Sequence, residues 1–148
     1  LFKAVDQIDQ VKFLDDYNLA KQQFNHMIIV EELFRARLEN REPLHTQTNT
    51  KLLPSLNELQ RRIEVSNQWF IEFVQNIRSE QLLQVLHFQF VDQKMGSLSI
   101  EEILFHMINH GTYHRGNIAP ALHHANVEHP ADTFTVFIHQ LEPERRVQ

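Results

Sequence analysis

The stretch ILFHMINHGTYHRG, Ile103–Gly116, is the part of the sequence around which the fold is interpreted. Histidine recurs in it at every fourth position, as His106, His110 and His114. Residues four apart on an α-helix differ by about 40° in direction, so the three imidazoles share one stripe of a helix. Two imidazoles at i and i+4 can hold one metal ion from a single helical face. We therefore expect the chain to build a bundle around this helix and to bring a further histidine to it.

Spacing alone does not choose the pair of ligands. His106 and His114 are about 12 Å apart along the helix axis, which is wide for two ligands of one ion at about 2.1 Å each. The pair is therefore either His106 with His110 or His110 with His114. The alternative to a metal site is a polar helix face with solvated or hydrogen-bonded histidines. Apolar neighbours such as Ile103 and Met107 favour a stripe that faces a bundle interior, where imidazoles need partners.

Composition limits the class of protein. The 148 residues, 42% hydrophobic and 22% charged, are typical of one globular domain. The net charge of −5 and scattered Lys and Arg argue against a nucleic-acid partner. No apolar run approaches the roughly 20 residues that span a bilayer, so no membrane partner is expected. The chain has no cysteine but 10 histidines, so any metal must be held by imidazole, carboxylate or water. A cytoplasmic location fits this composition.

Two helices are predicted in the first part of the chain. Leu1–Phe13 has the apolar spacing of the last turns of a helix, and a turn is expected over residues 15–17. The pattern of Leu19–Leu38 indicates a second helix, with His26 beside its apolar stripe. A histidine hydrogen-bonded to a neighbour is the alternative to a ligand at His26.

A polar segment with two prolines, Glu39–Pro54, then predicts a long crossover that allows neighbouring helices to run parallel. His45 in this segment is expected to be solvated. Ser55 and Glu58 form a capping-box pattern that opens a third helix, ending near residue 77. Its expected inner face is Leu56, Leu59, Ile63, Phe70, Phe73, Val74 and Ile77.

A short hairpin is predicted to lead into the histidine helix. The period of two in Val85–Val91 favours a strand that packs its phenylalanines on the bundle and leaves His87 exposed. Ser99 and Glu102 repeat the capping-box pattern where the histidine helix starts. Pro120 predicts a kink or a helix end nearby.

The last element predicted is a short helix from residue 133 to about 140. Asp132 precedes it and is the expected cap. The run TFTVFI within it is also compatible with a strand by propensity.

Three motifs resemble one known family. NHGTYHRGN, Asn109–Asn117, is similar to the N-H-x-T-x-H-R-G-Q signature of the DinB/YfiT-like family of small bacterial metalloenzymes. FNHMIIVEELFRARL, Phe24–Leu38, resembles the second-helix pattern of that family, and the hairpin of Leu86–Ser99 also matches. The sequence departs from the family at Asn117, usually Gln, and at Phe34, usually Trp. Neither position is an expected ligand.

The resemblance implies an all-α fold, a four-helix bundle of the up-up-down-down type with a long crossover, in one domain spanning residues 1–148. The family's first helix is longer than this chain provides, so a first helix truncated at its N-terminus is expected. The resemblance also implies a metal held by His26, His110 and His114. His106 then becomes a neighbour of the site.

Three imidazoles leave a coordination position open, as in catalytic rather than structural zinc sites. The resemblance implies a divalent metal-dependent enzyme, either a thiol-dependent S-transferase or a hydrolase acting on a small molecule, with a homodimer as the assembly. The thiol would come as a low-molecular-weight cosubstrate. Zinc or nickel is expected first, with iron or manganese as alternatives. The competing hypothesis is a non-enzymatic metal-binding or stress-response bundle. Glu31 is placed too far round its helix to be a direct ligand, and Arg115 is expected to form a structural ion pair.

Overall fold

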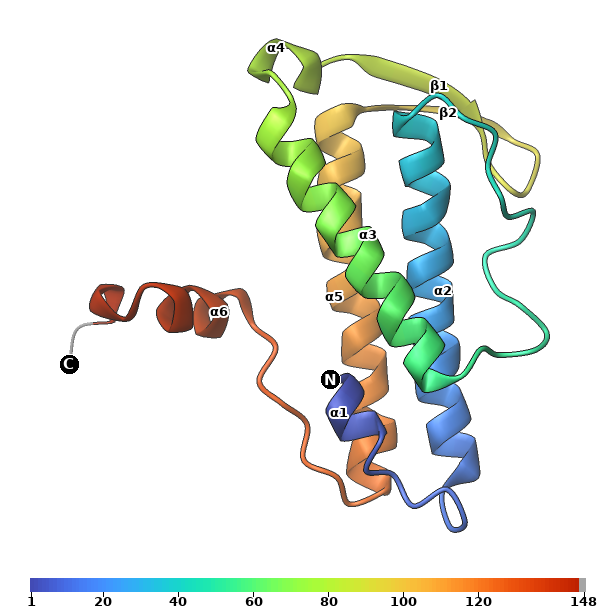
Figure 1. Ribbon diagram of the computed structural model, residues 1–148, viewed down its shortest axis with the longest axis vertical. Helices are drawn as coiled ribbons and strands as arrows, with labels where there is room; N and C mark the ends of the chain where they lie inside the picture. The colour runs from blue at the N-terminus through green and yellow to red at the C-terminus, as the bar shows by residue number, and fades with distance from the viewer. Residues whose placement is uncertain (147–148) are drawn as a thin grey trace.

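A computed structural model describes residues 1–146 of the chain, and it is dominated by three long helices (Figure 1). These are α2 (Leu14–Leu38), α3 (Leu56–Asn76) and α5 (Ile100–His124). α2 and α3 run in the same direction and α5 runs against them, with the crossover between α2 and α3 returning along the length of the bundle (Figure 1). The predicted all-α bundle with a small hairpin and a short C-terminal helix is confirmed.

The first helix, α1 (Phe2–Val5), covers one end of this bundle. Its Phe2 ring stacks on the Phe24 ring of α2, with the centroids 3.9 Å apart. Val5 is completely buried in a cluster that also contains Leu59 of α3 and Ile118 of α5. This end of the molecule is therefore closed by four helical segments.

The predicted turn over residues 15–17 is wrong, because α2 already begins at Leu14. Asp15 and Asp16 lie in the first helical turn, where the positive end of the helix dipole favours carboxylates. The reversal of the chain lies before Leu14 instead, and α2 continues to Leu38 as predicted.

The third helix starts as predicted, with the Ser55 side chain accepting a hydrogen bond from the Glu58 backbone N–H. Only Leu56, Leu59 and Ser66 of α3 are fully buried. Val74, predicted on the inner face, is 52% exposed. The prediction fails there because α3 packs mainly on α2, and the flank of its C-terminal half that carries Val74 is uncovered in the described chain.

The hairpin consists of β1 (Val85–Gln89) and β2 (Met95–Ser99), paired antiparallel with Phe88 opposite Gly96. Phe88 is buried against Phe34 of α2, and the two rings meet edge to face. His87 points to the other face and is exposed, as predicted. A single helical turn, α4 (Ser79–Leu82), precedes the hairpin and was not predicted.

The hairpin delivers the chain directly into α5. The Ser99 side chain accepts a hydrogen bond from the Glu102 N–H, and the Glu102 carboxylate accepts one from the Ser99 N–H at 2.7 Å. This reciprocal pair satisfies two backbone N–H groups that have no acceptor within the helix, so the predicted capping box is confirmed. The helix continues past Pro120 and ends one turn later, at His124.

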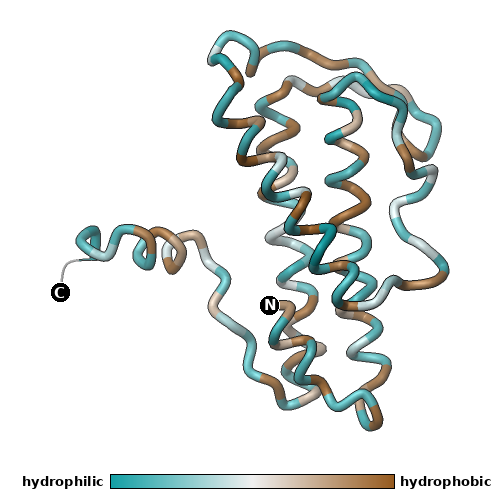
Figure 2. Tube along the Cα trace, viewed as in Figure 1, coloured by the Kyte–Doolittle hydropathy of each residue, from teal (hydrophilic) through white to brown (hydrophobic). Residues whose placement is uncertain are grey.

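The C-terminal helices, α6 (Phe134–Leu141) and the 3₁₀ turn η1 (Pro143–Arg145), stand away from the bundle (Figure 1). Thr133 caps α6, whereas Asp132, the predicted cap, pairs with Arg115. Hydrophobic and hydrophilic residues alternate along the helices, as the colouring of the trace shows (Figure 2). None of the described helices combines the length and hydrophobicity that crossing a bilayer requires.

Candidate metal centre

Three histidines from two helices meet in the middle of the bundle. His26 comes from α2, and His110 and His114 come from adjacent turns of α5. One ring nitrogen from each lies within 4.8 Å of the other two. The Nε2 atoms of His26 and His110 are 3.1 Å apart. Ligands at about 2.1 Å from a tetrahedral ion are separated by about 3.4 Å, so the group has the spacing that one ion requires.

Hydrogen bonds behind two of these rings fix which nitrogen carries the proton. His26 Nδ1 lies 2.8 Å from the Thr48 carbonyl oxygen, and His114 Nδ1 lies 2.6 Å from Gln23 Oε1. Both oxygens can only accept, so each Nδ1 is the donor and each Nε2 keeps its lone pair. Such outer hydrogen bonds orient imidazole ligands in metal sites. The donor set therefore fits a divalent ion.

Burial and the neighbouring imidazoles favour the neutral forms of His110 and His114. Burial, followed by the neighbouring His114, His26 and His106, lowers the pKa of His110 to about 3. Burial and His26 also lower the pKa of His114. A neutral imidazole is the form that binds a metal, because protonation would occupy the lone pair. The lowered pKa values of His110 and His114 therefore favour the form of each ring that can bind an ion.

The crossover that supplies the Thr48 carbonyl is held in place by Asn25, the residue before His26. Asn25 is completely buried, and its Nδ2 donates to Asn49 Oδ1 and to Thr50 Oγ1, the latter at 2.9 Å. A buried amide held by two polar partners fixes the loop more strongly than apolar contact would. The position of Thr48 behind His26 follows from these bonds.

His106 lies beside the centre but outside the group of three. Its ring contacts that of Phe34, with centroids 5.2 Å apart, and its ring centroid is 5.1 Å from that of His110. No hydrogen bond of its side chain is found within residues 1–146. Of the two pairs that spacing allowed, the structure brings His110 and His114 to His26.

Glu31 is buried about one turn beyond His26 in α2, but it contacts α3 and not the three histidines. Its carboxylate accepts a hydrogen bond from Ser66 Oγ of α3 at 2.5 Å. Burial raises the pKa of Glu31 to about 7, although the Ser66 hydrogen bond acts in the opposite direction. No carboxylate joins the three histidines in the described part of the chain. Within the described residues, the candidate centre therefore consists of the three imidazoles alone.

Two further sequence predictions have opposite outcomes. Arg115 forms an ion pair with Asp132 and a hydrogen bond to Thr112, in agreement with the predicted structural ion pair. The prediction that His45 is solvated is wrong. Its Nε2 lies 2.5 Å from the Glu32 carboxylate, which also accepts a hydrogen bond from Arg62 of α3. The sequence separates these three residues too widely for a local pattern to reveal the contact.

Sequence reasoning missed the residues that orient the ligands. Gln23 lies three positions before His26 and therefore on the same side of α2, which is a signal that could have indicated it. Thr48 contributes only its backbone carbonyl, which no side-chain pattern can reveal. Asn25 directly precedes the histidine, but its loop partners are 24 and 25 positions away.

The fold and the site together define a helical-bundle protein with a three-imidazole group able to hold a divalent ion. The sequence profile of the DinB family matches residues 10–146. The chain therefore belongs to the DinB family, in agreement with the resemblance of its motifs.

A curated relative is similar over much of the chain. Protein DinB of Bacillus subtilis (strain 168) is 30% identical over 104 residues, which cover 70% of this chain and 58% of the relative. The match thus spans little more than half the length of that protein. No solved structure matches the chain significantly.

Proposed function

We propose that the chain binds one divalent metal ion through His26, His110 and His114 and is a metal-dependent enzyme acting on a small molecule. The convergence of three imidazoles, without a fourth protein ligand in the described residues, carries this proposal. Structural zinc sites are closed by four protein ligands, whereas catalytic sites keep a position open. The partly exposed side chains of all three histidines support access from solvent.

Each residue has a definable part in this proposal. His26 and His114 present Nε2, because their Nδ1 atoms are held by Thr48 and Gln23. His110 provides the third ring nitrogen of the group. A divalent ion in such a site lowers the pKa of coordinated water or thiol and supplies a nucleophile near neutral pH.

We favour thiol-dependent S-transfer over hydrolysis. The chain has no cysteine, so a low-molecular-weight thiol would enter as a cosubstrate beside a small electrophile. Zinc or nickel is the first choice of metal, with iron and manganese as alternatives, because imidazole can be a ligand of all four. A homodimer and a cytoplasmic location stay predictions.

The test starts with metal content. Wild-type protein, His110→Ala and His123→Ala are purified without chelator and assayed by elemental analysis. His123 is an exposed histidine of the same helix and serves as the matched control. We expect one equivalent of metal in the wild type and in His123→Ala and a loss in His110→Ala. Equal metal in all three proteins would refute the site.

Thiol consumption then tests the reaction. Wild-type protein loaded with zinc or nickel is incubated with glutathione or cysteine and 1-chloro-2,4-dinitrobenzene, and the remaining thiol is measured. S-transfer predicts turnover that disappears in His110→Ala but not in His123→Ala. Stoichiometric metal without turnover, together with a coordinatively closed ion, would instead assign a metal-binding module.

A further inference from the structure

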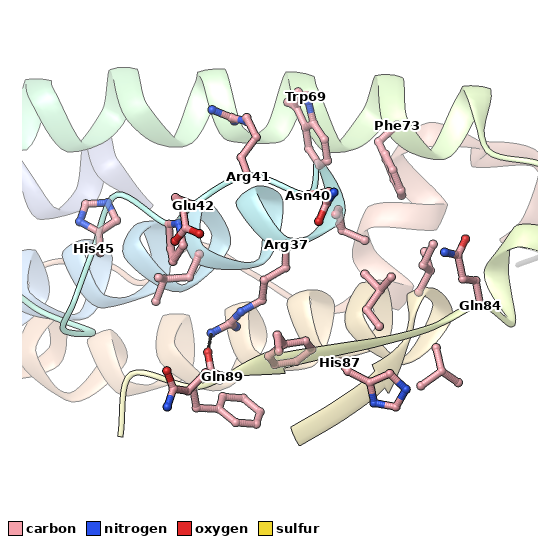
Figure 3. A pocket seen from close by; sticks show the side chains of 18 of the residues that line it. Arg37, Asn40, Arg41, Glu42, His45, Trp69, Phe73, Gln84, His87 and Gln89 are labelled. Atoms are coloured by element: carbon pink, nitrogen blue, oxygen red, sulfur yellow. Dashed lines mark hydrogen bonds between the residues drawn. The ribbon is translucent and has the colours of Figure 1, made fainter. Parts of the chain in front are cut away.

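A large cavity lies at the hairpin end of the bundle and does not include the three histidines of the candidate centre. Its volume is about 1310 Å³, more than the roughly 300–1,000 Å³ of typical small-molecule pockets. The C-terminal halves of α2 and α3, strand β1 and the start of the crossover line it, and it is open to solvent on one side (Figure 3). A small molecule can therefore fit without rearrangement of the helices.

Aromatic and aliphatic side chains provide opposite walls of this cavity. Trp69 and Phe73 of α3 lie on one side, with their rings roughly parallel and their centroids 5.0 Å apart. Strand β1, whose Leu86 and Phe88 also line the cavity, runs along the other side (Figure 3). These walls favour a ligand with an apolar body, because its transfer from water to such surfaces is favourable.

Arg37 is one of two arginines that line the cavity, the other being Arg41. Its guanidinium carbon lies 4.7 Å from the ring centroid of Phe34, 4.3 Å from that of Phe88 and 5.3 Å from that of Phe90. One N–H donates to the Gln89 carbonyl oxygen at 3.3 Å, the bond drawn in Figure 3. The three rings hold the guanidinium in place and shield it partly from water.

The guanidinium of Arg37 differs from those of its neighbours in lacking an anion. Arg35 and Arg41 both pair with Glu39. Arg37 forms no ion pair with any carboxylate in residues 1–146, and burial lowers its pKa. A guanidinium offers five N–H donors, and one is used here, so several are left for a ligand. A charge-assisted bond is stronger at such a partly desolvated cation than in water.

We propose that this cavity binds an apolar molecule carrying one carboxylate, with Arg37 holding the carboxylate and the Trp69–Phe73 wall holding the apolar body. Glu42 and Glu72 also line the cavity and are exposed. Their negative charges oppose a ligand with several anionic groups, so nucleotides and other polyanions are disfavoured. The proposal does not depend on a metal at the three histidines.

The test compares two probes that differ in charge. The full chain, labelled with ¹⁵N, is titrated with 4-phenylbutyrate and with its neutral amide, 4-phenylbutanamide, and followed by NMR. We expect saturable binding of the carboxylate, with shifts centred on Arg37, the Trp69 indole and β1. Loss of the charge-assisted bond makes the amide about tenfold weaker. Equal affinity for both probes, shifts confined to the histidine centre, or no binding of either would overturn the proposal.

Variants distinguish binding of the carboxylate by Arg37 from nonspecific apolar binding. Arg37→Gln should weaken 4-phenylbutyrate about tenfold and leave the amide unchanged. Arg61→Gln removes the same charge from the exposed face of α3 and should change neither. Gln84→Trp fills the cavity from an exposed lining position and keeps the backbone bond to Ile100, so it should weaken both probes. Unchanged carboxylate binding in Arg37→Gln, or in folded Gln84→Trp, would refute the assignment.

Discussion

Glu31→Gln should change how the stability of the protein depends on pH. Burial raises the pKa of Glu31 to about 7 in the folded protein, from an ordinary value of 4.5. Between these two values the folded chain holds a proton that the unfolded chain has released. The free energy of unfolding therefore falls as pH rises through this window, by up to about 1.4 kcal/mol per pH unit. The total penalty at pH 8 is about 3 kcal/mol.

Glutamine removes this titration and keeps an oxygen that accepts the hydrogen bond from Ser66. Relative to the wild type, Glu31→Gln should thus gain about 3 kcal/mol of stability between pH 4.5 and pH 8. The histidines with lowered pKa values, such as His110, act in the opposite direction because the unfolded chain binds more protons there. They contribute equally to both proteins, so the difference between the two stabilities isolates Glu31.

The assay is urea denaturation of metal-free protein at four pH values from 5 to 8, followed by circular dichroism. Glu64→Gln is the matched control, since Glu64 is an exposed carboxylate of α3. Its stability difference from the wild type should stay constant over the same range. A constant difference for Glu31→Gln as well would refute the argument that burial keeps this carboxyl protonated.

Three further substitutions test the centre and its support. Gln23→Leu removes the hydrogen bond behind His114 and should weaken zinc binding about 10- to 100-fold in competition with a chromophoric chelator; unchanged affinity would mean that this bond does not orient the ring. Ser99→Ala removes the oxygen that caps the Glu102 N–H and should lower the free energy of unfolding by about 1 kcal/mol. Ile103→Ala opens a cavity at a completely buried position and should cost about 2–5 kcal/mol in the same denaturation assay; a loss below 1 kcal/mol would indicate that the neighbours close the gap.

Local signals predicted most of the fold because the elements carry their own caps. The S-x-x-E patterns at Ser55 and Ser99 located the starts of two helices, where each serine side chain accepts a bond from the glutamate N–H; the reciprocal bond forms only at Ser99. The wrong turn predicted at the start of α2 also came from a local signal. Asp15 and Asp16 suit a turn and a first helical turn equally well, and only the packing of the following residues decides between them.

Periodicity placed three histidines on one stripe but could not choose among them. The choice of His110 and His114 came from the resemblance of NHGTYHRGN to a family motif, because two neighbouring pairs have identical spacing. What separates His106 from the others is its contact with Phe34, a residue of another helix. A contact between helices depends on how they pack, which a periodicity within one helix does not contain.

The crossover shows why the orientation of the ligands was out of reach of sequence analysis. His26 is directed by a carbonyl oxygen of Thr48, and that oxygen is placed by the bonds from Asn25 to the next two residues of the loop. The start of the crossover also lines the cavity at the hairpin end of the bundle, for example through His45 and Thr46. Since the loop has no regular secondary structure, its conformation is set by these side-chain bonds rather than by propensity. The polar residues Asn49 and Thr50 thus have a structural role, because their side chains accept the bonds from Asn25 beside the histidine centre.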